Sequence, residues 1–383
     1  MSESPAPQRW DLFCRVVDNL GDAAVMWRLA RQLAVERRCA VRLFIDQPAV
    51  LQRLVPGAGP GRTCDGVEIC TMPDDDASCG VISPDDAEVV VTGFHAALPA
   101  SYRRRMTPHH PAWINLEYLS AERWIDDFHG LPSPRSDGLT EHYFYPGFTQ
   151  RSGGLLREAD LLNRRDAFLA DATHAQRFLS SLGVSAGHGE TLASLLCYPD
   201  APLDALARQL AGSAARLHLL VPEGVPTGAT DCAALTSAAD GRLRITRIPF
   251  LCQYDYDRLL WSCDLNFVRG EDSWVRGLWS GKPFIWQAYK QHAANHLRKL
   301  EAFLGLLEPG LLGEATRWWN HAPDIAPLAI VEVTAQPASA GACLAPLAAR
   351  LAASDLASRL TAFAAAVRRQ NLAASSRPGS LQS

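Results

Sequence analysis

The stretch that most constrains the fold of this chain is residues 10–28, WDLFCRVVDNLGDAAVMWR. An apolar run over 12–17 is followed by a polar break that carries Asp18, Gly21 and Asp22, and then by apolar residues at helical spacing. This order predicts a strand, a tight loop and a helix. Ligands of open α/β sheets bind at the carboxyl ends of strands, where such loops lead into helices. The two aspartates are therefore expected beside a binding crevice, the alternative being that they only cap the helix and close the turn.

The second half of the chain repeats this arrangement. Residues 265–268 predict a strand, RGEDS at 269–273 a loop, and 274–280 a helix. Further strands are expected in this half, alternating with helices, at 192–198, 217–221, 243–248 and 282–286. Alternation of this kind predicts a second parallel, Rossmann-like sheet.

In the first half, strands are expected at 41–45, 67–70, 88–92 and 113–118. The strand ending at Thr92 leads to His95, which either contacts a substrate or is only hydrogen-bonded in its loop, and Glu117 lies at the end of the strand over 113–118. Residues 120–158 have no clear period, which in a compact domain indicates a functional segment. Helices are expected over 160–182 and 343–367.

Length and composition narrow the class of protein. A chain of 383 residues favours two domains, and 48% hydrophobic with 20% charged residues is ordinary for a globular enzyme. A net charge of −4 without a basic stripe argues against nucleic acid as the main partner. The first ten residues have no apolar core of a signal peptide, and no segment approaches about 20 uninterrupted apolar residues, so we expect a cytoplasmic protein that does not enter membranes.

The ten cysteines include no CxxC pair. Several fall within apolar strands, as buried thiols of a reducing compartment do. We therefore expect neither a disulfide nor a structural zinc site.

Several motifs together resemble one known family. VVDNLGD followed by WRLARQLA, NLEYLSAE at 115–122, YPGF and GGLLRE within 145–158, LNFVRGEDSWVRG at 265–277 and KPFIWQAY at 282–289 occur in this order. The series is similar to that of the EarP family, which transfers L-rhamnose from dTDP-β-L-rhamnose to an arginine of translation elongation factor P.

The resemblance implies an α/β fold of the GT-B class, with two Rossmann-like domains facing one another across a cleft. Residues 1–165 would form an acceptor-binding domain, rejoined by a C-terminal helix at about 355–375. Residues 190–354 would bind the nucleotide sugar, and 376–383 would be a disordered tail. An inverting glycosyltransferase that needs no metal ion is the implied enzyme.

The RGEDS loop is the expected donor site. An arginine fork and the N–H groups at a helix start can stabilise the negative charge of a departing diphosphate. By the resemblance, Arg269, Asp272 and Ser273 line the diphosphate and nucleotide, and Glu271 is required for activity. By itself, a carboxylate such as Glu271 at a strand end suits a pair of sugar hydroxyls, whereas Asp272 or Ser273 is also expected to cap the helix.

Other donor residues come from the same resemblance. Gln253, Tyr256 and Tyr289 match positions that hold the base and phosphates, and the aromatic rings can stack on a pyrimidine. The family favours an aromatic pair where this chain has Leu196 and Tyr198, so only Tyr198 can stack here. Gly21, Tyr198, Gln253, Tyr256, Arg269, Asp272, Ser273 and Tyr289 make up the predicted donor-binding set.

The acceptor implied by the resemblance gives the two aspartates a chemical role. A protonated guanidinium has no free lone pair on nitrogen, so a carboxylate must orient it and remove a proton as the new C–N bond forms. We assign Asp22 as the likeliest base and Asp18 as its partner in holding the guanidinium, with the roles open to exchange. A carboxylate opposite the leaving group gives inversion.

The sequence gives less support to other functions. The first strand is not followed by GxGxxG, residues 277–282 lack P-loop spacing, and HAANH at 292–296 has alanine where a zinc protease needs glutamate. His292 and His296 are better interpreted as a solvent-facing pair. Two alternatives stay open: a nucleotide-sugar transferase with a small-molecule or lipid acceptor, and a non-catalytic module that binds a nucleotide sugar or a protein.

Overall fold

The computed structural model describes residues 7–17, 20–72, 87–185, 187, 189–226, 232–290, 295–322 and 328–375. The chain divides into two compact units, residues 1–158 with 354–383 and residues 159–353. The expected first domain, 1–165, thus extends into the second unit, whereas the last long helix belongs to the first. The predicted tail at 376–383, His292 and all of residues 74–86, which the sequence indicates to be an acidic loop, lie outside the described residues.

The first unit is built on a sheet of eight strands in the order β3-β4-β2-β1-β5-β6-β8-β7. From β4 to β8 the pairing is parallel, and the two edge strands β3 and β7 pair antiparallel. The strands are β1 Arg9–Cys14, β2 Ala40–Ile45, β3 Thr63–Cys64, β4 Val67–Thr71, β5 Val89–Gly93, β6 Ala112–Leu116, β7 Pro132–Pro134 and β8 Thr140–Phe144.

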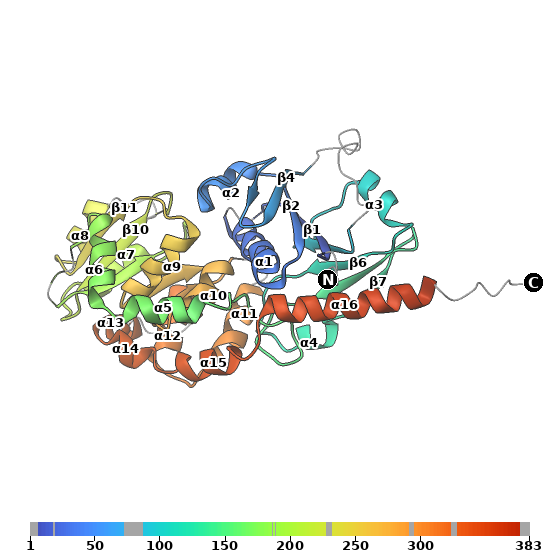
Figure 1. Ribbon diagram of the computed structural model, residues 1–383. Helices are drawn as coiled ribbons and strands as arrows, with labels where there is room; N and C mark the ends of the chain where they lie inside the picture. Colours follow the sequence, from blue (N-terminus) through green and yellow to red (C-terminus); the bar gives the residue numbers. More distant parts are fainter. Residues whose placement is uncertain are drawn as a thin grey trace, which may run out of the picture. The chain divides into compact units, whose positions relative to one another are not determined.

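Helices cover both faces of this sheet. They are α1 Gly21–Arg37, α2 Pro48–Leu54, α3 Ala100–Met106, α4 Ile125–Phe128 and α16 Leu356–Ser375. Figure 1 shows α16, in red, running past α1, and α16 also packs against β6. On the other face, Tyr102 and Met106 of α3 pack with Phe13, Phe44 and Trp113. Strand side chains point alternately to the two faces of the sheet, and because helices cover both faces, the side chains on both are buried.

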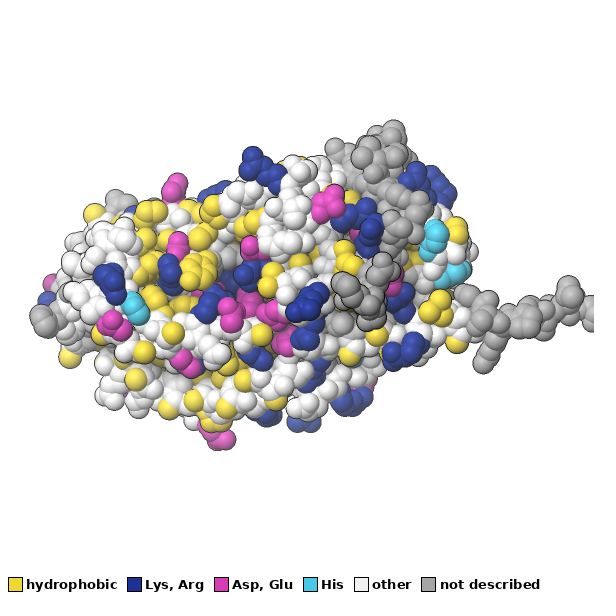
Figure 2. Space-filling model, in the orientation of Figure 1, with side chains coloured by type: hydrophobic (Ala, Val, Ile, Leu, Met, Phe, Trp, Pro, Cys, Tyr) yellow, Lys and Arg dark blue, Asp and Glu magenta, His cyan; other side chains and the backbone are white. Residues whose placement is uncertain are grey.

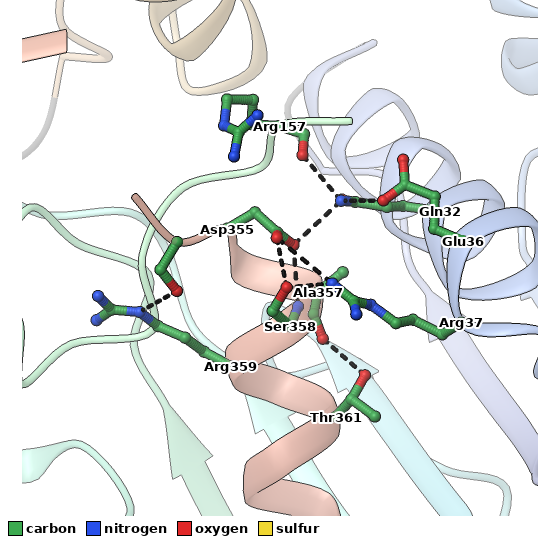
Figure 3. A network of polar contacts seen from close by, with 10 residues as sticks. Gln32, Glu36, Arg37, Arg157, Asp355, Ala357, Ser358, Arg359 and Thr361 are labelled. Atoms are coloured by element: carbon green, nitrogen blue, oxygen red, sulfur yellow. Dashed lines mark hydrogen bonds and ion pairs between the residues drawn. The ribbon is translucent and has the colours of Figure 1, made fainter. Parts of the chain in front are cut away.

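A polar network fixes the C-terminal helix to the first unit (Figure 3). Asp355 caps α16, because its Oδ1 accepts the N–H of Ser358 at 2.9 Å. The same Oδ1 accepts from Nε2 of Gln32 at 3.1 Å, and Gln32 also donates to the carbonyl of Arg157 at 2.8 Å. Arg37 of α1 contacts both Asp355 and Ser358. One cap therefore joins three segments that are far apart in the sequence.

The second unit contains five parallel strands in the order β11-β10-β9-β12-β13. Numbered within the unit this order is 3-2-1-4-5, the doubly wound arrangement. The strands are β9 Thr191–Leu195, β10 Leu217–Pro222, β11 Leu243–Ile248, β12 Leu265–Arg269 and β13 Phe284–Gln287. The helices are α5 Leu161–Leu169, α6 Ala172–Ser181, α7 Leu203–Leu210, α8 Cys232–Ala238, α9 Gln253–Ser262, α10 Asp272–Trp279, α11 Asn295–Leu304, α12 Leu311–Trp319, α13 Leu328–Ala335, α14 Pro337–Ala340 and α15 Leu344–Leu351.

Three stretches differ from the sequence prediction. The supposedly irregular segment 120–158 contains α4, β7 and β8, and β8 is a full member of the parallel sheet. The helix expected over 160–182 is two helices, the second capped by Asp171, whose Oδ1 accepts the N–H of Thr173 at 2.8 Å. The helix expected over 343–367 is also interrupted, since α15 ends at Leu351 and Asp355 starts α16.

Candidate active site

The first unit carries the β1–α1 loop at the point where its strand order reverses. β1 lies between β2 and β5, and α1 begins at Gly21. Asp22 lies in the first turn of α1 and is 3% exposed, and its Oδ2 accepts the N–H of Val17 at 2.8 Å. The alternative, that Asp22 only caps the helix, does not hold, because Leu20 is the N-cap residue and Asp22 bonds to the loop. Asp18 lies outside the described residues.

A second carboxylate braces the same loop. Oδ1 of Asp46, just after β2, accepts the N–H of Val16 at 2.9 Å, and Gln47 donates to the Val16 carbonyl at 3.1 Å. Burial, followed by the charges of Asp22 and Asp46, raises the pKa of the Cys14 thiol well above its usual range. Both carboxylates therefore lie near the carboxyl end of β1, which makes this end acidic.

Gly93 allows α1 to approach the neighbouring strand. A Cβ at this last residue of β5 would lie 2.6 Å from the sulfur of Met26, closer than packed atoms tolerate. Because Gly93 has no side chain, the first turns of α1 can pack closely on the sheet. This close packing keeps Asp22, in the first turn of α1, near the carboxyl ends of the strands.

The second unit also carries a strand-to-helix loop at its switch point, between β12 and α10. Gly270 has a φ of +60°, a conformation that favours glycine, and α10 begins at Asp272. The prediction that Asp272 or Ser273 caps this helix is wrong, since Glu271 is the N-cap residue and makes no side-chain cap. The Ser273 hydroxyl instead accepts the N–H of Arg269 at 2.9 Å and donates to its carbonyl at 2.5 Å. These bonds close the loop into a compact turn.

Arg269 lies at the switch point of the second sheet, between β9 and β12. Its NH1 donates to the Cys197 carbonyl at 2.6 Å, and its guanidinium lies 4.7 Å from the centre of the Tyr198 ring. Tyr289 meets the same ring edge to face, with centroids 5.4 Å apart. The structure thus brings together three of the predicted donor residues, one from each of three neighbouring strand ends.

Glu271 is paired within the second unit. Nζ of Lys299, on α11, lies 3.0 Å from Oε1 of Glu271, and both side chains are 18% exposed. Sequence analysis did not identify Lys299, because it is distant in the sequence and belongs to no motif. A carboxylate held in this way is oriented, and carboxylate oxygens can accept hydrogen bonds from a ligand hydroxyl.

The remaining predicted donor residues lie on α9 and α10. Gln253 is the first residue of α9 and is buried. Burial raises the pKa of the partly buried Tyr256 phenol, and the charges of Asp272 and Asp257 add to this, while the nearby Ser273 hydroxyl lowers it. The phenol therefore stays neutral beside the loop.

Two buried contacts hold the loop from behind. Trp286 donates to the Gly270 carbonyl at 2.8 Å and stacks on Trp274, with ring centroids 3.8 Å apart. Arg276 of α10 makes a bidentate pair with Asp257 of α9, at 2.8 and 2.6 Å. Trp286 belongs to the KPFIWQAY motif at 282–289, but its position in the sequence did not predict that its indole bonds to the loop.

Gln287 extends this support to the tyrosines. Its Oε1 accepts the N–H of Tyr198 at 2.8 Å, and its Nε2 donates to Asp200 at 3.0 Å. The backbone beneath the Tyr198 ring is therefore fixed before any ligand arrives, as preorganised binding requires.

Within the described part of the chain, no three His, Cys, Asp or Glu side chains are grouped closely enough to share a metal ion. The nine cysteines in that part are free thiols. None of the described helices has the length and apolar character needed to cross a membrane. Figure 2 shows Lys and Arg side chains interspersed with Asp and Glu side chains over the face in view.

Comparison with known proteins places these loops in context. The profile described as elongation factor P (EF-P) rhamnosyltransferase EarP matches residues 10–365, which include both. A protein-arginine rhamnosyltransferase of Pseudomonas aeruginosa is 46% identical over 83% of this chain and 88% of its own. A structure described as the basis for EarP-mediated arginine glycosylation of EF-P covers 93% of this chain and 98% of its own, at 31% identity and a TM-score of 0.59.

A UDP-glucosyltransferase from Polygonum tinctorium is also similar in structure. It covers 95% of this chain and 99% of its own, with 10% identity and a TM-score of 0.54. At this identity the likeness shows the fold alone, which is the two-domain GT-B fold of glycosyltransferases.

Proposed function

The chain belongs to the EarP family and is a protein-arginine rhamnosyltransferase of the GT-B class, and we infer that it moves L-rhamnose from dTDP-β-L-rhamnose to an arginine of elongation factor P. The observation that carries this inference is a family match that spans both strand-to-helix loops, one acidic and one cationic. The second unit would bind the nucleotide sugar and the first the acceptor.

The donor side follows from the β12–α10 loop. As the glycosidic bond breaks, the diphosphate gains negative charge, which Arg269 and the N–H groups at the start of α10 would stabilise. Tyr198 and Gln287 hold this region in place, so little reorganisation is needed. Since these groups supply the positive charge, the proposed reaction uses no metal ion.

Glu271, in this proposal, contacts a hydroxyl of the ribose or of the sugar. Lys299 fixes one oxygen of the carboxylate at 3.0 Å. The oriented carboxylate would accept a hydroxyl hydrogen bond in a defined direction, which orients the donor for attack.

The acceptor side follows from the β1–α1 loop. Asp22 would bind the guanidinium through charge-assisted hydrogen bonds and take the proton released as nitrogen attacks the sugar. Its bond to Val17 fixes one oxygen, so the carboxylate approaches in one orientation. Asp18 follows Val17 in the sequence and is proposed to hold the second edge of the guanidinium. Attack from the side opposite the diphosphate inverts the anomeric carbon.

The test is the intact mass of purified elongation factor P after incubation with the protein and dTDP-β-L-rhamnose, with and without a chelator. We expect one added deoxyhexose per molecule, unaffected by the chelator, and none on a factor whose acceptor arginine is replaced by lysine. An unmodified factor beside hydrolysed or transferred sugar would contradict the protein acceptor. Dependence on added divalent metal would contradict the metal-free donor site.

A further inference from the structure

A second polar cluster lies beside the β1–α1 loop in the first unit. It consists of His95, two residues after β5, and of Asn115 and Glu117 at the end of β6. β5 is paired with β1 on one side, Cys14 opposite Gly93, and with β6 on the other. Neighbouring strands are about 4.8 Å apart, so His95 follows the strand next to the one that leads to Asp22, and Asn115 and Glu117 lie one strand farther away.

The hydrogen bonds of the cluster determine the tautomer of His95. Oδ1 of Asn115 accepts the backbone N–H of His95 at 3.1 Å, which turns the Asn115 amide NH₂ toward Nδ1 of the imidazole, also at 3.1 Å. Nδ1 must therefore accept, and Nε2 carries the proton that it donates to Oε1 of Glu117 at 2.9 Å.

Glu117 is the buried end of this chain of bonds. It is 6% exposed, and its Oε1 also accepts from Nδ2 of Asn115 at 2.7 Å. Burial raises the pKa of Glu117 and the charge of Glu141 adds to this, while the interaction with His95 lowers it. The carboxylate behind His95 polarises the ring and makes its faces more electron-rich.

The imidazole itself is presented to solvent. The His95 side chain is 61% exposed although both nitrogens are bonded, so the exposed part is the ring face and its carbon edge. Phe94 and His95 have φ values of +54° and +60°, which residues other than glycine rarely adopt. The Phe94 ring stacks on the Tyr118 ring, with the ring centroids 4.5 Å apart. Strained backbone that is held in this way is typical of functional positions.

We propose that the face of His95, oriented by Asn115 and Glu117, stacks on the guanidinium of the acceptor arginine and presents it to Asp22. This rests on the proposed arginine acceptor. A guanidinium is planar and weakly hydrated, and it stacks readily on aromatic faces. Both imidazole nitrogens are already bonded, so the ring offers a flat contact and no competing donor. His95 is then a substrate-binding residue, and Asn115 and Glu117 are positioning residues.

Two substitutions separate stacking from hydrogen bonding. His95→Gln keeps an N–H donor for Glu117 but removes the ring. His95→Phe keeps a ring face, and Asn115 still donates to Glu117. If the ring face is what binds, His95→Gln raises the KM for the acceptor protein by about tenfold, the scale of one cation–aromatic contact. His95→Phe should stay within about threefold of the wild type, and donor KM should not change in either variant.

An unchanged acceptor KM in His95→Gln would overturn the proposal. Equal losses in both variants, or a loss in His95→Phe alone, would also overturn it by assigning His95 to the support of Glu117. A second measurement does not depend on sugar transfer. The wild-type protein is titrated with N-acetyl-arginine amide and, separately, with N-acetyl-lysine amide, and the NMR signals of the His95 ring protons are followed. Shifts with the arginine amide alone support stacking, and equal or absent shifts contradict it.

The two failures are distinguishable. A wild-type protein that leaves elongation factor P unmodified refutes the proposed acceptor, while the arginine titration still reports on His95. A wild-type protein that modifies the factor normally, with His95→Gln equal to it, refutes only the role of His95.

Discussion

The β1–α1 loop of the first unit and the β12–α10 loop of the second each border the point where the strand order of a doubly wound sheet reverses, yet they carry opposite charge. The first is bordered by Asp22 and Asp46, which bond to backbone N–H groups of the loop. The second presents Arg269 over Tyr198. One architecture thus offers an anionic site suited to a guanidinium and a cationic site suited to a diphosphate.

The loops are also stabilised differently. The cationic loop is closed by Ser273 and braced from behind by Trp286 and by the buried Arg276–Asp257 pair. The acidic loop is held by carboxylates that accept hydrogen bonds from its backbone N–H groups. Rigid support suits a site that binds charge developing in the transition state, because reorganisation there would cost catalytic rate.

The strongest test of the difference is Asp22→Asn, with Asp46→Asn as its matched control on the same loop. If Asp22 is the base, its loss lowers turnover by about 10²- to 10⁴-fold, the range of general base catalysis. Asp46→Asn keeps an oxygen for the Val16 N–H and should lose much less. Single-turnover rates with saturating donor and acceptor measure both. Equal losses would mean that both carboxylates only shape the loop.

The rigid support of the cationic loop is tested by Arg276→Ala. Removing one member of a buried ion pair leaves Asp257 uncompensated, so we expect a loss of about 3–5 kcal/mol in the free energy of unfolding. Arg317→Ala breaks an exposed pair with Glu301 and should cost about 0–1 kcal/mol. Urea unfolding monitored by tryptophan fluorescence compares them. If Arg276→Ala loses no more unfolding free energy than Arg317→Ala, the Arg276–Asp257 pair does not stabilise the cationic loop.

Substituting Arg269 removes the cation of the second loop. Loss of one preorganised donor to a developing oxyanion costs about 10²- to 10³-fold in turnover, which we expect for Arg269→Ala. Arg269→Lys keeps the charge but loses the planar fork and the stacking on Tyr198, so it should recover only part of the rate. Full recovery by lysine would show that charge alone matters at this position.

A pH scan gives the smallest effect and concerns the sheet beneath the cationic loop. His218 of β10 is buried, and burial followed by the charge of Arg244 lowers its pKa from 6.5 to about 4. The unfolded state therefore binds a proton more readily than the folded state, so stability falls as pH decreases from 6.5 toward about 4. Melting temperatures of His218→Gln should vary less with pH over that window. An unchanged pH dependence would mean that other groups dominate.

Much of both loops could be predicted from the sequence, because their signals are local. An apolar run, a polar break and a helical stripe occur within about 20 residues, and the same pattern placed Arg269 and Glu271 at a strand end. The parallel strands of the second unit are short apolar runs bordered by loop residues. Such strands need no distant partner to be recognised.

The parts that were missed depend on distant partners. β8 was not predicted because its sequence, TEHYF, buries Glu141 and His142, so it shows no apolar run. The burial of Glu141 is offset by Arg135 and by the Thr92 hydroxyl at 3.3 Å. Likewise, Asp355 interrupts an alanine-rich stretch by capping α16. Its side chain is held by Gln32, which is more than 300 residues away in the sequence. Spacing along the chain does not reveal these contacts.

The most direct test of the central claim, that the acidic loop serves the acceptor and the cationic loop the donor, is a calorimetric titration with dTDP-β-L-rhamnose of the wild type, Asp22→Asn and Arg269→Ala. We predict that Asp22→Asn binds the donor with a Kd within about threefold of the wild type, although its turnover is lost, whereas Arg269→Ala binds at least about tenfold more weakly. Loss of donor binding in Asp22→Asn, or wild-type binding in Arg269→Ala, would contradict this division of roles.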